Sequence, residues 1–344
     1  MIEQIDKNFA LPQDAARPGL QYRNVTEVPF TVHGLLREDG KFVRLPRTVA
    51  EATSSGVAEL NVCTAGGRVR FVTDSPYVAI YVKYNLILRM AHMTRSGSVG
   101  FDLYADDIYR GSYITTGKKD TFEAVVDLPE GGLHIITVHF PLYSGVDELY
   151  IGTAEGCTLE QAPDYAVARP VVYYGSSITQ GGCASRPGNC YQNILSRLLD
   201  CDHVNLGFSG SAKGEDAMAQ YIAGLDMGAF VLDYDNNSEL EELTERHEAF
   251  FRTIRARQPE TPVLMLSRPK YHLDAEEQTR LAVVRRTYEN AVAAGDKNVY
   301  FIPGPDLIEE RVREIATVDG DHPNDSGFVS MAYAMKPVLE KMLG

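Results

Sequence analysis

Four short polar segments carry the residue types that acyl transfer requires. They read GSSITQGG at residues 175–182, GFSGSAKG at 207–214, DYDNNS at 233–238 and VDGDHPNDSGF at 318–328. Together they offer hydroxyl groups, glycine N–H groups, carboxamides and an Asp–His pair. Nucleophilic catalysis by serine needs such a set, because a free hydroxyl is a weak nucleophile without a base and the oxyanion needs hydrogen-bond donors.

Apolar runs typical of buried strands position these segments. The runs VVYY, HVNLGF and FVLDY come directly before the first three segments, PVLMLS comes before SRPKYH, and NVYFIP precedes the last segment. Buried parallel strands read as continuous apolar runs because helices cover both faces of the sheet. The intervening stretches have apolar residues three and four apart, which predicts βαβα alternation and a doubly wound parallel sheet. Ligands of such sheets bind beyond the carboxyl ends of the strands, where the polar segments lie.

The N-terminal half has the period of half-buried strands. In YVAIYVK, residues 77–83, Val78, Ile80 and Val82 alternate with the residues between them. Many short runs of this kind predict an all-β sandwich, which we expect to be jelly-roll-like. We therefore predict two domains: a β-sandwich over residues 1–162 and a flavodoxin-like α/β domain over residues 163–344.

One helix start can be predicted in detail. Ser238 precedes the stretch SELEELTERHEAFF and has Glu241 three residues after it. Serine at the N-cap with glutamate at the third helical position forms a capping box, so we expect this helix to begin after Ser238.

The charge of the chain restricts its partners. The 344 residues include 33 Lys and Arg against 47 Asp and Glu, a net charge of -14. Without a sizeable basic cluster, nucleic acid and anionic membranes are disfavoured as partners, and oligomerisation is left open. The N-terminus lacks the positive start and apolar core of a signal peptide, and no apolar run approaches the ~18 residues of a membrane span. We expect a cytoplasmic protein, unless a leader has been removed.

The sequence predicts neither a cofactor nor a metal. Asp233, Asp235 and Asn237 resemble the start of a calcium loop, but Ser238 and Thr244 stand where the loop needs Gly and Glu. The five cysteines have no CxxC spacing, which favours reduced thiols, although a pairing of Cys183 with Cys190 is left open. The five are Cys63, Cys157, Cys183, Cys190 and Cys201.

With these segments in this order, the chain resembles the SGNH (GDSL-type) hydrolases over roughly residues 168–344. GSSIT matches the first block of the family with Ser177 at the nucleophile position, and Ser176 replaces the usual Asp. NLGFSGS matches the second block with Gly210. DGDHPN matches the last block, with Asp319 and His322 in D-x-x-H spacing.

The third block, LDYDNN, is the weakest match. Asn237 aligns best with the asparagine of the family, but the usual Gly before it is missing, which leaves Asn236 as a competitor.

The resemblance implies a Ser-His-Asp mechanism. His322 would take the proton of Ser177, and Asp319 would hold the imidazole in one tautomer. The N–H groups of Ser177 and Gly210, with the Asn237 amide, would form the oxyanion hole.

Several of these residues also have ordinary structural interpretations. Ser177 could instead cap a helix, and His322 could be a solvent-exposed loop histidine. Arg268 and His272 follow the fourth strand and could contact the substrate or only the solvent. The same two interpretations apply to Arg89 and His92, in the segment LRMAHMTRSGS of the β-half.

The resemblance extends to family members with an N-terminal β-sandwich, several of which look like carbohydrate O-acetylesterases. The resemblance therefore implies a serine esterase that acts on a small acyl ester, with an acetylated sugar or glycoside as the expected substrate. Two alternatives remain: an acyltransferase that uses the same acyl-enzyme, and a non-catalytic carbohydrate-binding protein.

Overall fold

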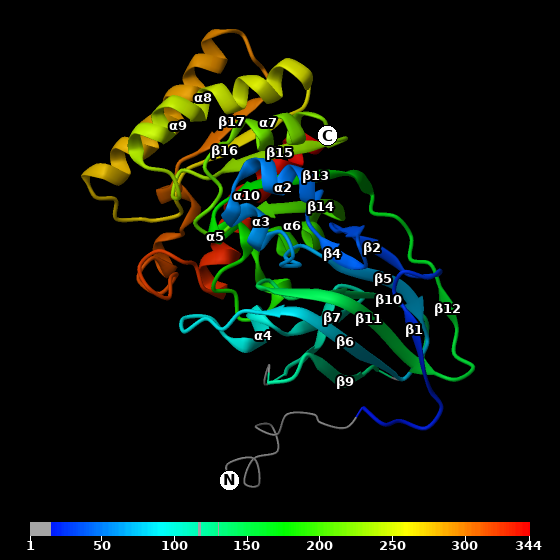
Figure 1. Cartoon of the computed structure of the whole chain (residues 1–344). Coiled ribbons are helices and arrows are strands. Elements are labelled where there is room, and N and C mark those ends of the chain that lie inside the picture. Colours follow the sequence, from blue (N-terminus) through cyan, green and yellow to red (C-terminus); the bar gives the residue numbers. More distant parts are fainter. Residues whose placement is uncertain (1–14, 116–117, 130) are drawn as a thin grey trace. The chain divides into compact units, whose positions relative to one another are not determined.

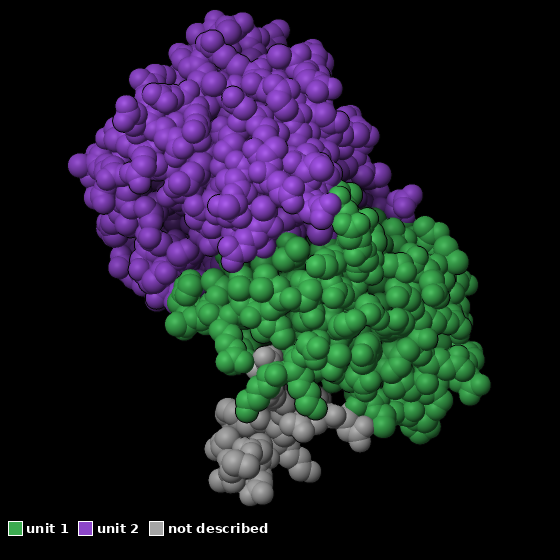
Figure 2. All heavy atoms as spheres, viewed as in Figure 1, with its two compact units in different colours: residues 1–42, 62–163, 185–188 green, residues 43–61, 164–184, 189–344 purple. Residues whose placement is uncertain are grey.

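The structure is a computed structural model that describes residues 15–115, 118–129 and 131–344. The first 14 residues, on which the absence of a signal peptide was partly argued, lie outside the described residues. The described chain forms two compact units, coloured separately in Figure 2. Of the described residues, unit 1 comprises 15–42, 62–115, 118–129, 131–163 and 185–188, and unit 2 comprises 43–61, 164–184 and 189–344. The units are thus interleaved along the chain, whereas the predicted domains are contiguous.

Unit 1 consists mainly of two antiparallel sheets (Figure 1). The first sheet has the strand order β1 (Leu20–Asn24), β11 (Ser144–Ala154), β6 (Tyr77–Ile87), β9 (Thr121–Asp127). The second has the order β12 (Leu159–Glu160), β5 (Arg68–Thr73), β10 (His134–His139), β7 (Phe101–Ala105), β8 (Ile108–Tyr113), and β2 (Thr31–His33) also pairs with β5. A short helix, α4 (Arg95–Ser98), precedes β7, and the hairpin of β3 (Leu36–Glu38) and β4 (Lys41–Val43) precedes β5.

The two sheets of unit 1 share one apolar core. Val78, Ile80 and Val82 of β6 are fully buried in a cluster that also contains Phe101 and Leu103 of β7, in the other sheet. This is the arrangement of a β-sandwich, in which each sheet buries one face against the other. The predicted sandwich is therefore confirmed, with β6 placing the predicted residues in its core.

Residues 185–188 belong to unit 1, although the residues on either side of them in the sequence belong to unit 2, and Asp102 of β7 binds this segment. The Asp102 carboxylate accepts hydrogen bonds from the Gly188 N–H at 2.8 Å and from Arg186 Nη1 at 3.0 Å. Its other oxygen lies 2.8 Å from His139 Nδ1. Asp102 is fully buried, so these partners replace the water that its charge would otherwise require.

Unit 2 is a five-stranded parallel sheet covered by helices (Figure 1). The strand order is β14 (Cys201–Gly207), β13 (Val167–Gly175), β15 (Ala229–Asp233), β16 (Val263–Leu266), β17 (Val299–Ile302). The first strand of the unit is therefore second in the sheet, which is the flavodoxin-like order that was predicted. The order reverses next to β13, so the ends of β13 and β15 flank the place where ligands of such folds bind.

The neighbouring residues Tyr173 and Tyr174 of β13 show that both faces of the sheet are covered. The Tyr173 ring meets Tyr191 of α6 (Tyr191–Leu199), with ring centroids 5.6 Å apart, and Tyr191 stacks on Phe328 of α10 (Asp325–Leu343). Tyr174 stacks on Phe250 of α8 (Leu240–Arg257), with ring centroids 4.9 Å apart. Alternate side chains of a strand point to opposite faces, so α6 and α10 lie on one face and α8 lies on the other.

Unit 2 also contains α7 (Asp216–Ala223), α9 (Ala275–Ala293), the four-residue α5 (Ser177–Gln180) and the 3₁₀ turns Gly304–Leu307 and Glu310–Val312. A further 3₁₀ turn, Pro187–Asn189, lies where the chain passes from unit 1 to unit 2. Among the described residues, none of the helices is long and apolar enough to cross a membrane. The predicted start of α8 is wrong by one residue. Its N-cap is Glu239, which makes no side-chain capping hydrogen bond, and the Ser238 hydroxyl is buried instead.

Residues 43–61 belong to the core of unit 2, although they precede most of unit 1 in the sequence. They form α2 (Arg47–Thr53) and α3 (Ser55–Leu60), and Leu45, Ala50 and Val57 are buried in the same apolar cluster as α7 and α8. The Arg44 guanidinium donates to the carbonyl oxygen of Gly207 and lies over the Phe208 ring. The segment therefore supports the loop after β14, which contains Gly210.

Candidate active site

Ser177 lies at the first position of α5, and only Ser176 separates it from the end of strand β13. The preceding Ser176 is the N-cap of α5, and its hydroxyl accepts a hydrogen bond from the Ile178 N–H at 3.2 Å. The turn between strand and helix is tight, because a Cβ at Gly175 would overlap both the Asp233 carbonyl oxygen and the Thr179 hydroxyl. The capping function that either serine could perform thus belongs to Ser176.

His322 lies within hydrogen-bond distance of both Ser177 and Asp319. Ser177 Oγ is 2.9 Å from His322 Nε2, and His322 Nδ1 is 2.8 Å from Asp319 Oδ2. The second carboxylate oxygen of Asp319 accepts backbone hydrogen bonds from His322 at 2.8 Å and from Asp321 at 3.0 Å. With its proton on Nδ1, the imidazole donates to Asp319 and presents Nε2 as an acceptor for the Ser177 proton.

Asp319 is held in its charged form. Partial burial alone would raise its pKa, but the hydrogen bonds from the His322 backbone, the His322 ring and the Asp321 backbone outweigh this effect and lower the pKa to about 2. A permanent carboxylate at this position favours the Nδ1-protonated tautomer and stabilises an imidazolium when Nε2 takes a proton. The three side chains therefore have the geometry and charge of a nucleophile, a base and an orienting acid.

Two of the three predicted oxyanion residues, Gly210 and Asn237, come from the loops after β14 and β15, which flank β13 in the sheet. Gly210 has φ +65°, in the left-handed region, and the space where a Cβ would stand is open. The Asn237 amide donates to the Phe208 carbonyl oxygen at 3.1 Å. A carboxamide has two N–H groups, so this bond orients Asn237 and leaves one donor. The predicted oxyanion hole of Ser177, Gly210 and Asn237 stays a prediction.

The competitor Asn236 has its side-chain oxygen buried, and that oxygen accepts no hydrogen bond from the residues that the structure describes. The choice between Asn236 and Asn237 thus still rests on the alignment of the block.

The residues predicted to bind substrate lie in both units. In unit 2, Arg268 forms ion pairs with Glu277, at 2.9 Å, and with Asp321. His272 is mostly exposed, 3.4 Å from Glu314. In unit 1, Arg89 and His92 are exposed residues of the segment between β6 and α4, where Arg89 lines a small cavity of about 40 Å³ with Leu88, Met90 and Met93. Substrate binding by Arg268, Arg89 and His92 stays a prediction.

Asp233 is a buried carboxyl group that the sequence suggested only as a strand end. Its Oδ2 accepts a hydrogen bond from Thr179 at 2.9 Å and one from Tyr191 at 3.3 Å. Burial, followed by the nearby charge of Asp235, raises its pKa to about 8. The raised pKa favours the protonated form of Asp233, which links the end of β15 to the helical turn that follows Ser177.

All five cysteines lie in the part of the chain that the structure describes, and none of them forms a disulfide. Cys183 is buried near Asp319, and burial together with that charge raises its pKa to about 11. The thiol is therefore protonated at neutral pH. A protonated thiol is a poor nucleophile and a poor metal ligand, because both roles require the thiolate. No disulfide joins Cys183 to Cys190.

Two family descriptions match different parts of the chain. Residues 168–340 match the GDSL-like lipase/acylhydrolase family. Residues 20–159 match the GxDLY model, which describes the N-terminal domain of SGNH-hydrolase-type esterases, and the chain reads GFDLY at residues 100–104. A comparison with curated proteins found no match.

Three solved structures illustrate the similarity over the whole chain. A Bacteroides ovatus protein described as a GDSL-like lipase is 29% identical, with a TM-score of 0.84, and the match covers 94% of this chain and 98% of that protein. The salicylyl-acyltransferase SsfX3 of a tetracycline biosynthetic pathway is 20% identical, with a TM-score of 0.77 and coverage of 95% and 98%. An acetyl xylan esterase of the rumen bacterium Butyrivibrio proteoclasticus is 12% identical, with a TM-score of 0.61 and coverage of 94% and 99%.

Proposed function

Since the chain belongs to the GDSL-like lipase/acylhydrolase family, we propose that it is a serine esterase that hydrolyses a small acyl ester through an acyl-enzyme. The observation that carries the proposal is the hydrogen-bonded series from Ser177 through His322 to Asp319, with contacts of 2.9 and 2.8 Å. A serine hydroxyl needs a base at this distance to act as a nucleophile at neutral pH.

The proposed reaction has two halves. His322 Nε2 takes the proton of Ser177 as its oxygen attacks the ester carbonyl, and the imidazolium then gives the proton to the leaving alcohol. Water, activated by the same nitrogen, releases the acid from the acyl-enzyme. The N–H groups of Ser177 and Gly210 and the free N–H of Asn237 would stabilise the tetrahedral oxyanion, where each donor typically contributes a factor of about 10²–10³ in rate.

Variants at the two adjacent serines test this mechanism. Ser177→Ala should lower kcat for p-nitrophenyl acetate by at least about 10⁴, because the nucleophile is lost. Ser176→Ala is the matched control, since it removes a hydroxyl one residue away and costs only the N-cap, about 1 kcal/mol of stability. The serine mechanism is wrong if a folded Ser177→Ala variant keeps its activity.

We propose that the substrate is an acetylated sugar or glycoside. The support is the two-domain fold shared with carbohydrate esterases such as the acetyl xylan esterase, and at this identity the similarity shows only the fold. Acetate release from a panel of acetylated sugars, measured beside esters of longer acids, tests the proposal. Cleavage of the longer esters without release of acetate from any sugar would exclude deacetylation.

Acyl transfer is the second candidate, because the fold is also shared with an acyltransferase. The two reactions have the acyl-enzyme in common and differ in whether water or an acceptor alcohol releases the acyl group. Mass spectrometry of products formed in the presence of added alcohols separates them: hydrolysis gives the free acid, and transfer gives a new ester.

A further inference from the structure

The loop that carries His322 is fixed mainly by its own backbone. The Val318 N–H donates to the His322 carbonyl oxygen at 2.9 Å, and the Asn324 N–H donates to the Ala316 carbonyl oxygen at 2.9 Å. The second bond ties the loop to Asn324, the N-cap of α10, and Ala316 and Pro323 near its two ends are buried. Between these ends, the side chains of Asp319 and Asp321 are 38% and 41% exposed, so packing holds this part of the loop less tightly.

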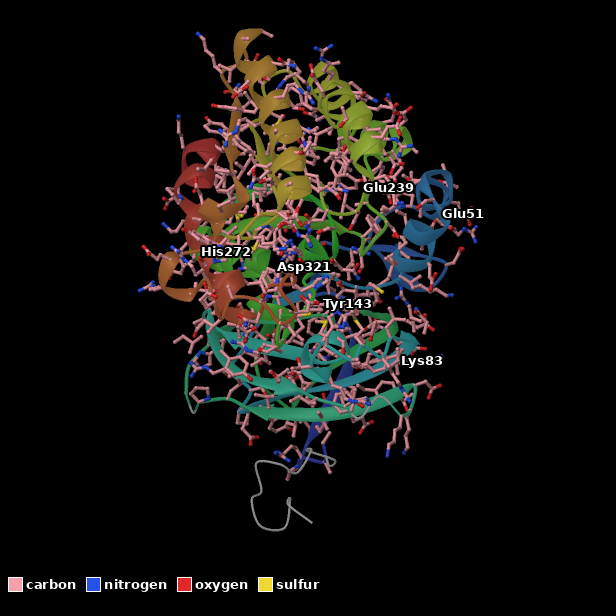
Figure 3. The ribbon with its side chains drawn as sticks, turned by 90° about the vertical axis from the view of Figure 1, so that its left-hand side faces the viewer. Glu51, Lys83, Tyr143, Glu239, His272 and Asp321 are labelled. Carbon is pink, nitrogen blue, oxygen red and sulfur yellow. The ribbon has the colours of Figure 1, made fainter. Side chains whose placement is uncertain are left out.

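A group of four charged residues, here called the Arg268 cluster, connects this loop to the body of unit 2. Arg268 Nη1 lies 2.9 Å from Glu277 Oε1, and its Nη2 contacts Asp321 Oδ2. Lys270 Nζ lies 2.7 Å from the same Glu277 oxygen and 3.8 Å from Asp321 Oδ1. Asp321, labelled in Figure 3, directly precedes His322 in the sequence.

The inner end of the cluster is anchored. Glu277 is buried at the third position of α9, where it forms a capping box with the N-cap Asp274 through bonds of 2.9 Å in both directions. One carboxylate oxygen of Glu277 is thus committed to the helix start, and the other faces the two cations. The Arg268 backbone is also fixed, since its N–H donates to Asp235 Oδ2 at 3.1 Å and a Cβ at Gly304 would overlap its carbonyl oxygen.

Asp321, the most exposed member of the Arg268 cluster, connects the cluster to Asp319. The Asp321 side chain binds Arg268, while the Asp321 N–H donates to Asp319 Oδ1 at 3.0 Å. Asp321 therefore connects the anchored guanidinium with the carboxylate that orients the imidazole. A rigid planar guanidinium on a carboxylate fixes direction better than an ammonium group does, because its donors have a fixed geometry.

We infer that Arg268 is a positioning residue, which holds His322 in hydrogen-bond contact with Ser177 by binding Asp321. The inference rests on the proposed serine mechanism and differs from the sequence-based expectation that Arg268 binds substrate. A displacement of about 1 Å in a catalytic group can reduce the rate by about 10²-fold. Replacing Arg268 should therefore lower kcat and leave the affinity for the substrate unchanged.

The variants Arg268→Gln, Asp321→Asn and their combination test the inference. Each single variant should lower kcat for p-nitrophenyl acetate by about 10- to 100-fold with KM changed by less than about twofold. The double variant should be no worse than the poorer single one, because both remove the same contact. Arg268→Lys should restore only part of kcat.

Arg255→Gln is the matched control. Arg255 forms a mostly buried ion pair, 2.8 Å from Asp296, near the amino end of β17, and also donates to backbone carbonyl oxygens such as that of Thr261. Among the described residues, none of its hydrogen bonds reaches the loop of His322. It should reduce stability but leave kcat within about threefold. If Arg255→Gln lowered kcat as much as Arg268→Gln does, general destabilisation would explain the effect and the inference would fail.

A proton NMR signal that can be measured without substrate provides a second test. The downfield proton NMR signal of the His322–Asp319 hydrogen bond should broaden or disappear in Arg268→Gln and Asp321→Asn, and persist in Arg255→Gln.

A raised KM with an unchanged kcat in Arg268→Gln would assign Arg268 to substrate binding instead. If the wild type hydrolysed no ester, the proposed function would fail, and the NMR comparison would still test whether Arg268 positions His322. Should Arg268→Gln not fold, Asp321→Asn gives the same test on the half-exposed side of the contact.

Discussion

Two adjacent serines, Ser176 and Ser177, have different hydrogen-bond partners. Ser176 accepts the Ile178 N–H as an N-cap, while Ser177 Oγ faces His322 Nε2 at 2.9 Å. The sequence suggested Ser177 for either function, because both serines precede a helix. What separates them is the position of His322, which lies 145 residues further along the chain.

Asp319 should be needed for its charge and not only for its shape. Asp319→Asn keeps the side-chain volume and can still accept the two backbone N–H bonds. Its amide can also donate to Nδ1, which favours the tautomer in which Nε2 carries the proton and cannot act as a base. We therefore expect kcat to fall by about 10⁴, in steady-state kinetics at pH 8, with an unchanged circular dichroism spectrum. A loss smaller than tenfold would show that the Asp319 carboxylate does not set the tautomer of His322.

At the scale of elements, the strands of unit 2 were easier to predict than the ends of its helices. The apolar runs VVYY and FVLDY became β13 and β15, because a strand buried on both faces leaves a continuous apolar signature. The helix start at Ser238 was predicted one residue early. The sequence LDAEEQ contains the capping box of Asp274 and Glu277, which follows the same rule and was overlooked.

The carboxyl end of β15 should make the stability of the protein depend on pH. The folded state keeps the Asp233 proton up to a pKa of about 8, whereas an unfolded chain releases it near 3.8. Folding therefore takes up a proton between these values, so the contribution of Asp233 to stability declines as the pH rises from about 4 to 8. Asp233→Asn cannot ionise and should lack this decline.

Thermal unfolding of Asp233→Asn and the wild type between pH 5 and pH 8 measures the effect. The Tm of the variant minus that of the wild type should increase over this range by about 5 °C or more. Asp226→Asn, whose side chain is 81% exposed in a surface ion pair, should show a constant difference. A constant difference for Asp233→Asn as well would mean that Asp233 is ionised in the folded protein at neutral pH.

At the scale of the whole molecule, the sequence predicted two contiguous domains, and contacts divide the chain differently. Residues 43–61 complete the core of unit 2, and residues 185–188 are held in unit 1 by Asp102. No local sequence pattern predicts to which unit these two segments belong. An amphipathic helix such as α2 fits any apolar surface, and the buried guanidinium of Arg44 finds its partner, the Gly207 carbonyl, 163 residues away.

The α/β part should not be stable when expressed alone. A fragment of residues 163–344 lacks Leu45, Ala50 and Val57, and each large buried side chain that is removed typically costs about 2–5 kcal/mol. We expect an insoluble fragment or one with exposed apolar surface, detected by dye binding and by the loss of cooperative unfolding. A fragment that unfolds cooperatively with the stability of the full chain would show that α2 and α3 are dispensable.

The interleaved units also have consequences for synthesis and inheritance. Residues 43–61 leave the ribosome more than a hundred residues before β13, so they must remain unpaired while the β-sandwich strands are made. Residues 185–188, which belong to the same unit as the sandwich, are translated only after β13. Neither unit can be completed before the other has begun, which couples their folding in time. A gene exchange that cut cleanly between the two halves would divide both units, so we expect recombination to transmit them together.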